Sequence, residues 1–379
     1  MTTKYSFVLL TTFILCVSCN PGKKVQTVDQ NIITTSAILT GDGTKTDIFF
    51  TILFNQYPEY FDSIVKHSRD WNVQIIYTQI DRGADNSQKL NNYYYNVNPK
   101  KYFYPASTVK LPVAVLALQR LNELKEKGLT RNTTMITKAA YSGQTEVYND
   151  STTSDGKPSI ANYIKKILLT SDNDAFNRIY EFLGQEYINE NLHRKGYSDA
   201  QVLHRLDIFL NEDENRHTNP VKFLDTNNTI LYRQPLVFNN TKYEVRNDLL
   251  GKAYYKGDEL INTPMNFSKK NRIGLEDLHN ILRSLIFPNT IPAKQRFGIP
   301  PEDYKFIYQY MSQYLSETVY PLYDTAVYYD AYVKFLLHGL NKEPLPKNHF
   351  LLQVSIYPPK IRKKHQNNTI QVPFYSFYF

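Results

Sequence analysis

The stretch YPASTVKLPVAVLALQRL, residues 104–121, places a serine and a lysine three positions apart at the start of a long apolar run. Residues three apart share one face of a helix, so Ser107 and Lys110 would lie side by side. A helix start carries unpaired backbone N–H groups and the positive end of the helix dipole, which favour a developing anion. Burial lowers the pKa of a lysine, so a neutral Lys110 amine could accept the Ser107 proton. The alternative is that Ser107 is an ordinary helix N-cap.

Two other short stretches bear on this choice. A second Ser-x-x-Lys match, SDGK at residues 154–157, lies in a loop with glycine and proline and has no apolar helix after it. The stretch LTSDNDAF, by contrast, places the tripeptide SDN at residues 171–173 between two segments with helical spacing. Alone, this turn would be interpreted as a helix cap. Together with the helix that follows Ser107, it favours a catalytic serine.

With the Tyr-Pro lead-in, the Ser-x-x-Lys helix and the Ser-Asp-Asn turn, the chain resembles the penicillin-recognising serine hydrolases, especially class A β-lactamases. The resemblance implies that Ser107 is the acylated nucleophile and that Lys110 is its base. It further implies that Ser171 relays a proton to the leaving nitrogen. By the same resemblance Asn173 holds the substrate amide, and Asp172 anchors the turn.

A later loop, DIFLN at residues 207–211, matches the phase of the Glu-x-x-Leu-Asn loop that supplies the deacylation base in class A enzymes. The resemblance implies that Asp207 positions the hydrolytic water and that Asn211 binds substrate. An aspartate is one methylene shorter than a glutamate, so its carboxylate has less reach toward that water. The other interpretation is that Asp207 only holds the loop, by pairing with Arg205 or Arg216.

A third family motif, a Lys-Thr/Ser-Gly strand near the C-terminus, is missing. In the family it gives a cation for the substrate carboxylate and a strand edge for the oxyanion hole. The Lys-Gly pairs at residues 195–196 and 256–257 belong to loops instead. Residues 347–379 form a divergent basic and aromatic tail. We expect that the coding frame changed near Lys347, so that this tail is not family sequence.

The N-terminus predicts export and a lipid anchor. Residues 1–18 combine a lysine with a short apolar core that ends at a small residue before Cys19. Such a core is too short to span a bilayer and is typical of a signal peptide. Its ending resembles a bacterial lipobox, which predicts lipidation at Cys19 and anchoring in the cell envelope, on the periplasmic side or at the outer membrane. The alternative is an ordinary cleaved signal with a leftover cysteine.

The remaining chain predicts a polar tether over residues 19–50 and a catalytic domain over 51–346. The expected fold is α+β, of the β-lactamase/transpeptidase type: an antiparallel sheet layered with helices, plus a helical subdomain, with the site between them. Two strands are not a stable sheet, so further strands are expected near the C-terminus. Strands are predicted over 71–81 and 90–98, and a hairpin over 229–245. Helices are predicted over about 51–67, after 104, on both sides of 170, over 274–287 and over 303–315.

The charge and the numbers of cysteines and histidines exclude several classes of function. The formal charge of +8 includes four basic residues within 360–379, and no nucleic-acid-binding motif is present. No cysteine follows Cys19 and the histidines form no ligand cluster, so disulfides, a metal and a cofactor are not expected. The sequence thus predicts a monomeric, lipid-anchored hydrolase of a β-lactam or a peptidoglycan-type substrate. Two alternatives are a D,D-peptidase that releases penicillin slowly and a catalytically impaired, envelope-anchored binding protein.

Overall fold

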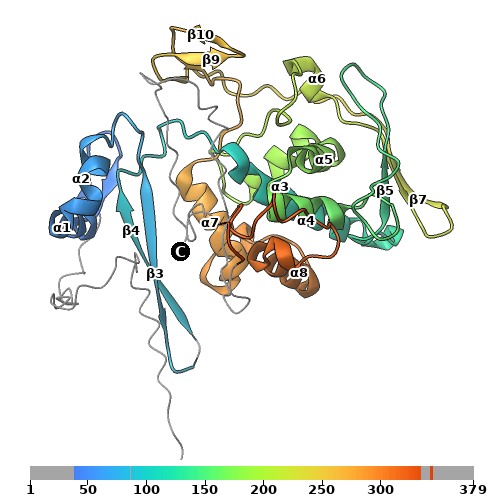
Figure 1. Cartoon of the computed structure of the whole chain (residues 1–379), viewed down its shortest axis with the longest axis horizontal. Coiled ribbons are helices and arrows are strands. Elements are labelled where there is room, and N and C mark those ends of the chain that lie inside the picture. The colour runs from blue at the N-terminus through green and yellow to red at the C-terminus, as the bar shows by residue number, and fades with distance from the viewer. Residues whose placement is uncertain (1–37, 86, 334–341, 345–379) are drawn as a thin grey trace, which may run out of the picture. The chain divides into compact units, whose positions relative to one another are not determined.

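The computed structural model describes residues 38–333, apart from residue 86, together with residues 342–344 (Figure 1). Cys19 and the tail 347–379 lie outside the described residues. Residues 38–333 belong to one compact unit. None of the helices in the described ranges combines the length and the hydropathy that crossing a bilayer requires.

The domain begins earlier than the sequence predicts. Strands β1 (Ile38–Leu39) and β2 (Lys45–Thr46) form an antiparallel pair, so residues 38–50 are not part of a tether. Asp47 is buried, and its backbone N–H donates to the Tyr94 carbonyl oxygen at 2.8 Å. The polar composition of residues 38–50 did not indicate that they pack on the domain, because their backbone groups bond to a strand that lies much later in the chain.

Two helices replace the single helix predicted over residues 51–67. They are α1 (Ile48–Gln56) and α2 (Pro58–Lys66). Pro58 lacks a backbone N–H and its ring clashes with the preceding turn, so a proline starts a helix more readily than it continues one. The aromatic ring of Phe49 packs on the predicted strand pair, 4.6 Å from the ring of Tyr93.

The predicted strand pair is confirmed as an antiparallel hairpin. Strand β3 (Ile75–Arg82) pairs with β4 (Gln88–Tyr95), with Ile75 opposite Tyr95 and Arg82 opposite Gln88. Helix α7 (Leu275–Ile286) lies beside β3, where Thr78 Oγ1 is 3.4 Å from His279 Nε2. Among the described residues no later strand joins this hairpin, so the further strands expected near the C-terminus are not part of the described fold.

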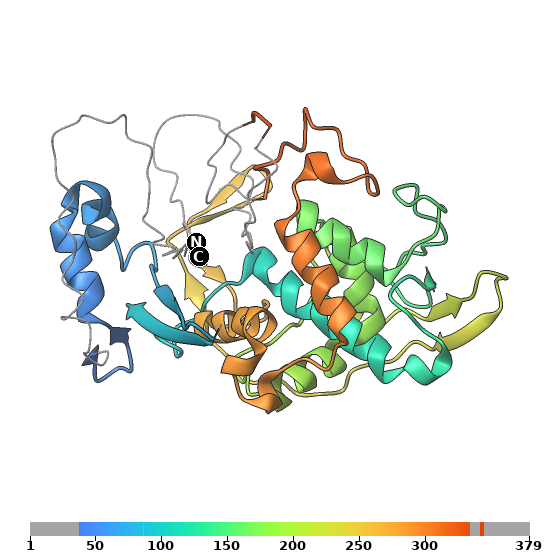
Figure 2. The same ribbon diagram turned by 90° about the horizontal axis from the view of Figure 1, so that it is seen from below.

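The helical part is built around a buried helix. The 3₁₀ turn η2 (Ala106–Val109) leads into α3 (Lys110–Glu123), whose residues 111–118 are all buried. A helix that is apolar on every side belongs in a core. Figures 1 and 2 show α3 beside α4 (Ile160–Thr170) and α5 (Asn173–Arg194), and α8 (Pro301–Ser312) packs on α4. The helices predicted around residue 170 and near 274 and 303 are therefore confirmed.

Helix α5 bends at Gly184, where φ is 75° and ψ is 160°. Only glycine adopts such a backbone without strain. A Cβ atom at this position would also lie 2.7 Å from Thr218 Cγ2. The glycine thus allows α5 to bend and to pass close to the Thr218 side chain.

A three-stranded antiparallel sheet corrects the predicted hairpin over residues 229–245. Strand β7 (Ile230–Gln234) pairs with the preceding β6 (Val221–Leu224), which also pairs with β5 (Thr134–Thr137). The chain reverses at Asn228, which has a φ of 62°, and the Asp225 backbone N–H donates to the Thr229 carbonyl at 2.9 Å. Sequence periodicity missed β6 because the strand is only four residues long.

Residues 249–266 form a largely exposed ribbon of two strand pairs. Strand β8 (Leu249–Leu250) pairs with β11 (Met265–Asn266), and β9 (Tyr254–Lys256) pairs with β10 (Glu259–Ile261). The Lys-Gly pair at 256–257 lies at the turn between β9 and β10 (Figure 1), as expected of a loop. A short helix, α6 (Glu212–Arg216), lies between α5 and β6 in the chain.

Candidate active site

Ser107 lies in η2, one turn before the buried helix. Its side chain caps neither helical element, since the N-cap positions are Pro105 and Val109 and neither start has a side-chain cap. The N-cap interpretation of Ser107 is therefore wrong. The preceding residue, Ala106, has a φ of 45°, a strained value for a residue with a Cβ atom. Strained backbone of this kind clusters at functional sites.

Lys110 is 2% exposed and its amine is fully engaged. Nζ donates to the Ser171 carbonyl oxygen, to Ser171 Oγ at 3.0 Å and to Asn173 Oδ1 at 2.7 Å. Among the described residues its hydrogen bonds are all to the Ser-Asp-Asn turn, and none joins it to Ser107. Burial lowers the pKa of Lys110 to about 7, against the raising effect of Asp172 and Asp207.

The Ser-Asp-Asn turn is both a helix junction and part of the site. Ser171 ends α4 in the left-handed region, with φ 56° and ψ 43°. Asp172 is the N-cap of α5 and accepts a hydrogen bond from the Ala175 backbone N–H at 2.8 Å. The predicted anchoring role of Asp172 is thus visible as a cap, and it leaves the side chains of Ser171 and Asn173 directed at Lys110.

Asp207 reaches the same cluster from a distant loop. It is exposed and has a φ of 56°. Its Oδ2 accepts a hydrogen bond from Asn173 Nδ2 at 3.3 Å, a long contact for this type of bond. Lys110, Ser171, Asn173 and Asp207 therefore form one connected polar group, with Ser107 one turn away from the lysine.

A comparison with protein-family models assigns the chain to a family. The model described as the β-lactamase enzyme family matches residues 59–296, more than half of the chain. The chain belongs to the β-lactamase enzyme family. The predicted resemblance to penicillin-recognising serine hydrolases and the α+β fold are thereby confirmed, and the matched range contains every residue of the polar group.

Other comparisons add little to the family assignment. The crystal structure of L2 complexed with relebactam matches with a TM-score of 0.32 and 9% identity, over 66% of this chain and 69% of that chain. A likeness of this size carries no argument about the β-lactamase-family chain. No curated protein sequence matches it.

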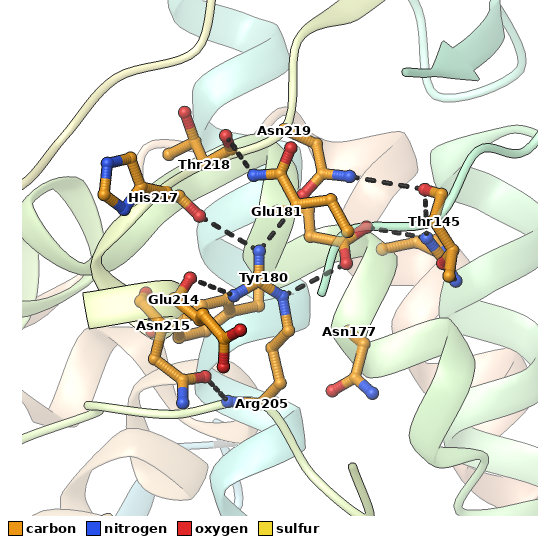
Figure 3. Close-up of polar contacts among 12 residues, drawn as sticks. Thr145, Asn177, Tyr180, Glu181, Arg205, Glu214, Asn215, His217, Thr218 and Asn219 are labelled. Carbon is orange, nitrogen blue, oxygen red and sulfur yellow. Dashed lines mark hydrogen bonds and ion pairs between the residues drawn. The ribbon is translucent and has the colours of Figure 1, made fainter. Parts of the chain in front are cut away.

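Arg205 and Arg216 do not pair with Asp207, contrary to the loop-anchor interpretation. Arg205 Nε bonds to Glu181 Oε1 at 3.1 Å, and its Nη2 donates to the His217 carbonyl at 3.0 Å and to Asn219 Oδ1 at 3.1 Å (Figure 3). Arg216 pairs with Glu212 at 3.2 Å. In the described chain Asp207 has no ion pair with either arginine, which leaves its carboxylate available at the site.

The buried ion pair between Arg205 and Glu181 was not predicted from the sequence. Burial raises the pKa of Glu181, against the lowering effect of Arg178 and Arg205. Arg178 Nη1 donates to Glu181 Oε2 at 2.9 Å within α5. A detectable signal existed, since Arg178 and Glu181, three positions apart, lie among the aliphatic and aromatic residues of the stretch AFNRIYEFL at 175–183. No feature of the sequence indicated that Arg205, in a distant loop, would be their partner.

Asn211 has a structural role, and its contact with substrate stays a prediction. Its Oδ1 accepts from the Glu214 backbone N–H at 2.9 Å, and Glu214 Oε2 accepts from the Asn211 backbone N–H at 2.8 Å. This reciprocal pair is a capping box at the start of α6. In the described chain no hydrogen bond links Asn211 to Lys110 or Asp207. The Asn-x-x-Glu spacing at residues 211–214 was a readable sign of this cap.

Ser154, the serine of the Ser-x-x-Lys match at residues 154–157, lies in an exposed turn, as expected from its loop sequence. No group of histidine, cysteine, aspartate or glutamate side chains within the described ranges is arranged to hold a metal ion.

Proposed function

We propose that this chain is a serine β-lactamase of the class A type, which opens β-lactams through an acyl-enzyme on Ser107. Membership of the β-lactamase family supports a hydrolase of this kind. The observation that carries the proposal is the environment of Lys110. Its amine is buried and held by Ser171 and Asn173, and its pKa of about 7 means that the neutral base is well populated at neutral pH.

Acylation proceeds in three proton transfers, which together move a proton from Ser107 to the leaving nitrogen. Ser107 Oγ attacks the lactam carbonyl carbon while the neutral Lys110 amine accepts the hydroxyl proton. The carbonyl–nitrogen bond then breaks. Lys110 passes a proton to Ser171 Oγ, which lies 3.0 Å from Nζ, and the Ser171 hydroxyl delivers its own proton to the leaving nitrogen. Asn173, fixed at the first position of α5, holds the amide of the substrate.

Deacylation is assigned to Asp207. Its exposed carboxylate takes a proton from a water molecule, and the hydroxide formed attacks the carbonyl carbon of the Ser107 ester. The bond between that carbon and Ser107 Oγ then breaks, and Ser107 Oγ takes up the proton held by Asp207, which releases the opened lactam as an acid. The short aspartate side chain favours slow release. If release is slow enough, the same residues describe a D,D-peptidase-like penicillin-binding protein, which acylates in the same way.

A pulse of fluorescent penicillin followed by a chase of unlabelled drug tests the proposal on the purified chain. Label that appears and then clears supports a β-lactamase. Label that appears and persists identifies a peptidase-like or deacylation-poor protein and refutes the hydrolytic turnover proposed here. Absence of label points to the impaired binding protein and refutes the acyl-enzyme itself.

We also propose that the chain is lipid-anchored at Cys19 in a bacterial envelope, where β-lactam hydrolysis would protect the cell. The support is the signal-like pattern of residues 1–19. Labelled palmitate supplied to expressing cells tests this. We expect Cys19→Ala to abolish incorporation and the neighbouring Cys16→Ala, a matched control, to retain it. Equal labelling of both variants would contradict the anchor at Cys19.

A further inference from the structure

The residues just before Asp207 are held in place by asparagine side chains. Residues 203–206 belong to no helix or strand. Their four backbone N–H groups all donate to side-chain amide oxygens: the first two to Asn271 at 2.7 and 3.0 Å, the third to Asn215 at 2.9 Å and the fourth to Asn177 at 2.7 Å. An asparagine amide offers both an acceptor and two donors, so it can replace the pairing that a strand would supply. This segment is therefore rigid without being regular.

Asn271 makes the largest set of these contacts and lies 1% exposed between β11 and α7. Besides its two acceptor bonds, its Nδ2 donates to the His204 carbonyl at 3.1 Å, and its backbone N–H donates to His204 Nε2 at 3.2 Å. Since Nε2 accepts, the His204 ring is neutral and carries its proton on Nδ1, which faces the Arg205 carbonyl at 2.5 Å. Burial lowers the pKa of His204 to about 4, in agreement with a neutral ring.

The backbone of Asn271 contacts the other side of the site. Its carbonyl oxygen accepts a hydrogen bond from the Tyr102 hydroxyl at 2.9 Å. Tyr102 is buried and precedes Ser107 by five positions in the chain. Asn271 thus contacts two parts of the site. Its side chain bonds to the segment before Asp207, and its main chain bonds to Tyr102, in the segment before Ser107.

Asp207 depends on this support because its own contacts are weak. It is exposed, and its hydrogen bond to Asn173 is 3.3 Å long. Its short side chain cannot compensate for a shift of the backbone that carries it. Displacement of a catalytic group by about 1 Å costs on the order of a hundredfold in rate.

We propose that Asn271 is a positioning residue for deacylation: its side chain fixes the segment that aims Asp207 at the Ser107 ester. The proposal rests on the proposed function, in which Asp207 acts only after the acyl-enzyme has formed. Removing the Asn271 side chain therefore lengthens the life of the acyl-enzyme. It leaves acylation unchanged, because the bond to Tyr102 is made by the main chain.

The test measures acylation and release separately, by labelling with fluorescent penicillin and chasing with unlabelled drug. We expect Asn271→Ala to lengthen the acyl-enzyme lifetime about ten- to a hundredfold while the acylation rate stays within about twofold. Asn191→Ala is the matched control. Asn191 is 4% exposed and accepts from Gln119 Nε2 at 3.0 Å and Arg194 Nη2 at 2.9 Å, at the far end of α5. We expect this control to leave the lifetime unchanged.

A second measurement separates positioning from general loss of stability. In an Asp207→Asn background, Asn271→Ala should lengthen the lifetime no further, because the group that it aims is already disabled. If Asn271→Ala does not fold, Asn271→Leu is measured, which fills the space of the side chain and still removes both acceptor bonds. A wild-type lifetime in the folded Asn271 variant, or additive effects with Asp207→Asn, overturns the inference alone. Absence of label on the wild type overturns the proposed function and this inference with it.

Discussion

Lys110 Nζ lies 3.0 Å from Ser171 Oγ, although 61 positions separate the two residues in the chain. The contact exists because α3 packs against α4 and α5 and because the αL conformation of Ser171 turns the chain toward the buried amine. A buried lysine without partners would be very costly. Here its three donors meet three acceptors, so the fold keeps a titratable amine inside the domain and in contact with a hydroxyl group.

The nucleophile is tested by two serine variants. Ser107→Ala should abolish the covalent adduct with penicillin, because no other serine stands at the start of the α3 helix. Ser154→Ala, which changes a second Ser-x-x-Lys serine, one that lies in an exposed turn, should leave it intact. Mass mapping of the labelled peptide checks both. An adduct on Ser154, or one that survives in Ser107→Ala, would refute the assignment.

The pKa of Lys110 predicts a pH dependence of acylation. Only the neutral amine accepts the Ser107 proton, and burial lowers its pKa to about 7. The acylation rate should therefore rise about tenfold per pH unit below pH 7 and level off above it. Lys110→Arg should reduce acylation at all of these pH values, since a guanidinium stays protonated. Rapid-quench labelling between pH 5 and 9 measures this.

The control for Lys110 is another lysine on a neighbouring helix. Lys166 lies in α4 and pairs with Asp150 at 3.1 Å. Lys166→Met should therefore keep the wild-type shape of the pH profile. A wild-type rate that does not change with pH would contradict the role of Lys110 as the base.

Substitutions of Asp207 test the deacylation base. Asp207→Asn should trap the acyl-enzyme, because an amide does not accept the proton of the attacking water. Asp207→Glu should retain or raise turnover, because the added methylene restores reach. Chase experiments give both lifetimes. If neither variant changes the lifetime but both lower the melting temperature, Asp207 serves the loop and not the reaction.

Asp277 should make stability fall as pH rises. Burial raises its pKa from 3.8 to about 7, and its carboxylate accepts from the Asp199 backbone N–H at 3.1 Å. Between these two values the folded chain holds a proton that the unfolded chain releases, so stability decreases through this window and the full cost is present above pH 7.

Asp277→Asn removes this titration and still provides an acceptor for Asp199. Its melting temperature should match the wild type near pH 4 and exceed it at pH 8, by about 2–4 °C for each kcal/mol that the charge costs. Melting curves across this range test the sign. Parallel curves for the two proteins would show that Asp277 does not titrate in this window.

Two buried tyrosines give opposite predictions for loss of a hydroxyl group. Tyr163 is 2% exposed and its hydroxyl has no hydrogen-bond partner among the described residues. Tyr163→Phe should therefore be neutral or raise the free energy of unfolding by about 1 kcal/mol. Tyr180 donates to the Leu203 carbonyl at 3.0 Å and the Asn215 carbonyl at 2.9 Å. Tyr180→Phe should lower that free energy by about 1–3 kcal/mol in urea unfolding, and the reverse order would contradict both assignments.

The sequence by itself determined the local parts of the site. The spacing of Ser107 and Lys110, the Ser-Asp-Asn turn and the helices around it were predictable, because helix periodicity and caps depend on residues only a few positions apart. The β3–β4 hairpin was predictable for the same reason. The capping box of Asn211 was equally local and could have been predicted, had the Asn-x-x-Glu spacing been weighed against the family pattern.

The tertiary structure decided the contacts between distant segments. It joined the Lys110 amine to Ser171, paired Arg205 with Glu181 and not with Asp207, and paired β7 with β6. It also brought Asn271 to the segment before Asp207. Such partners are selected by burial: each polar group removed from water must find the nearest available acceptor or donor, and which one is nearest depends on how the helices pack and not on sequence spacing.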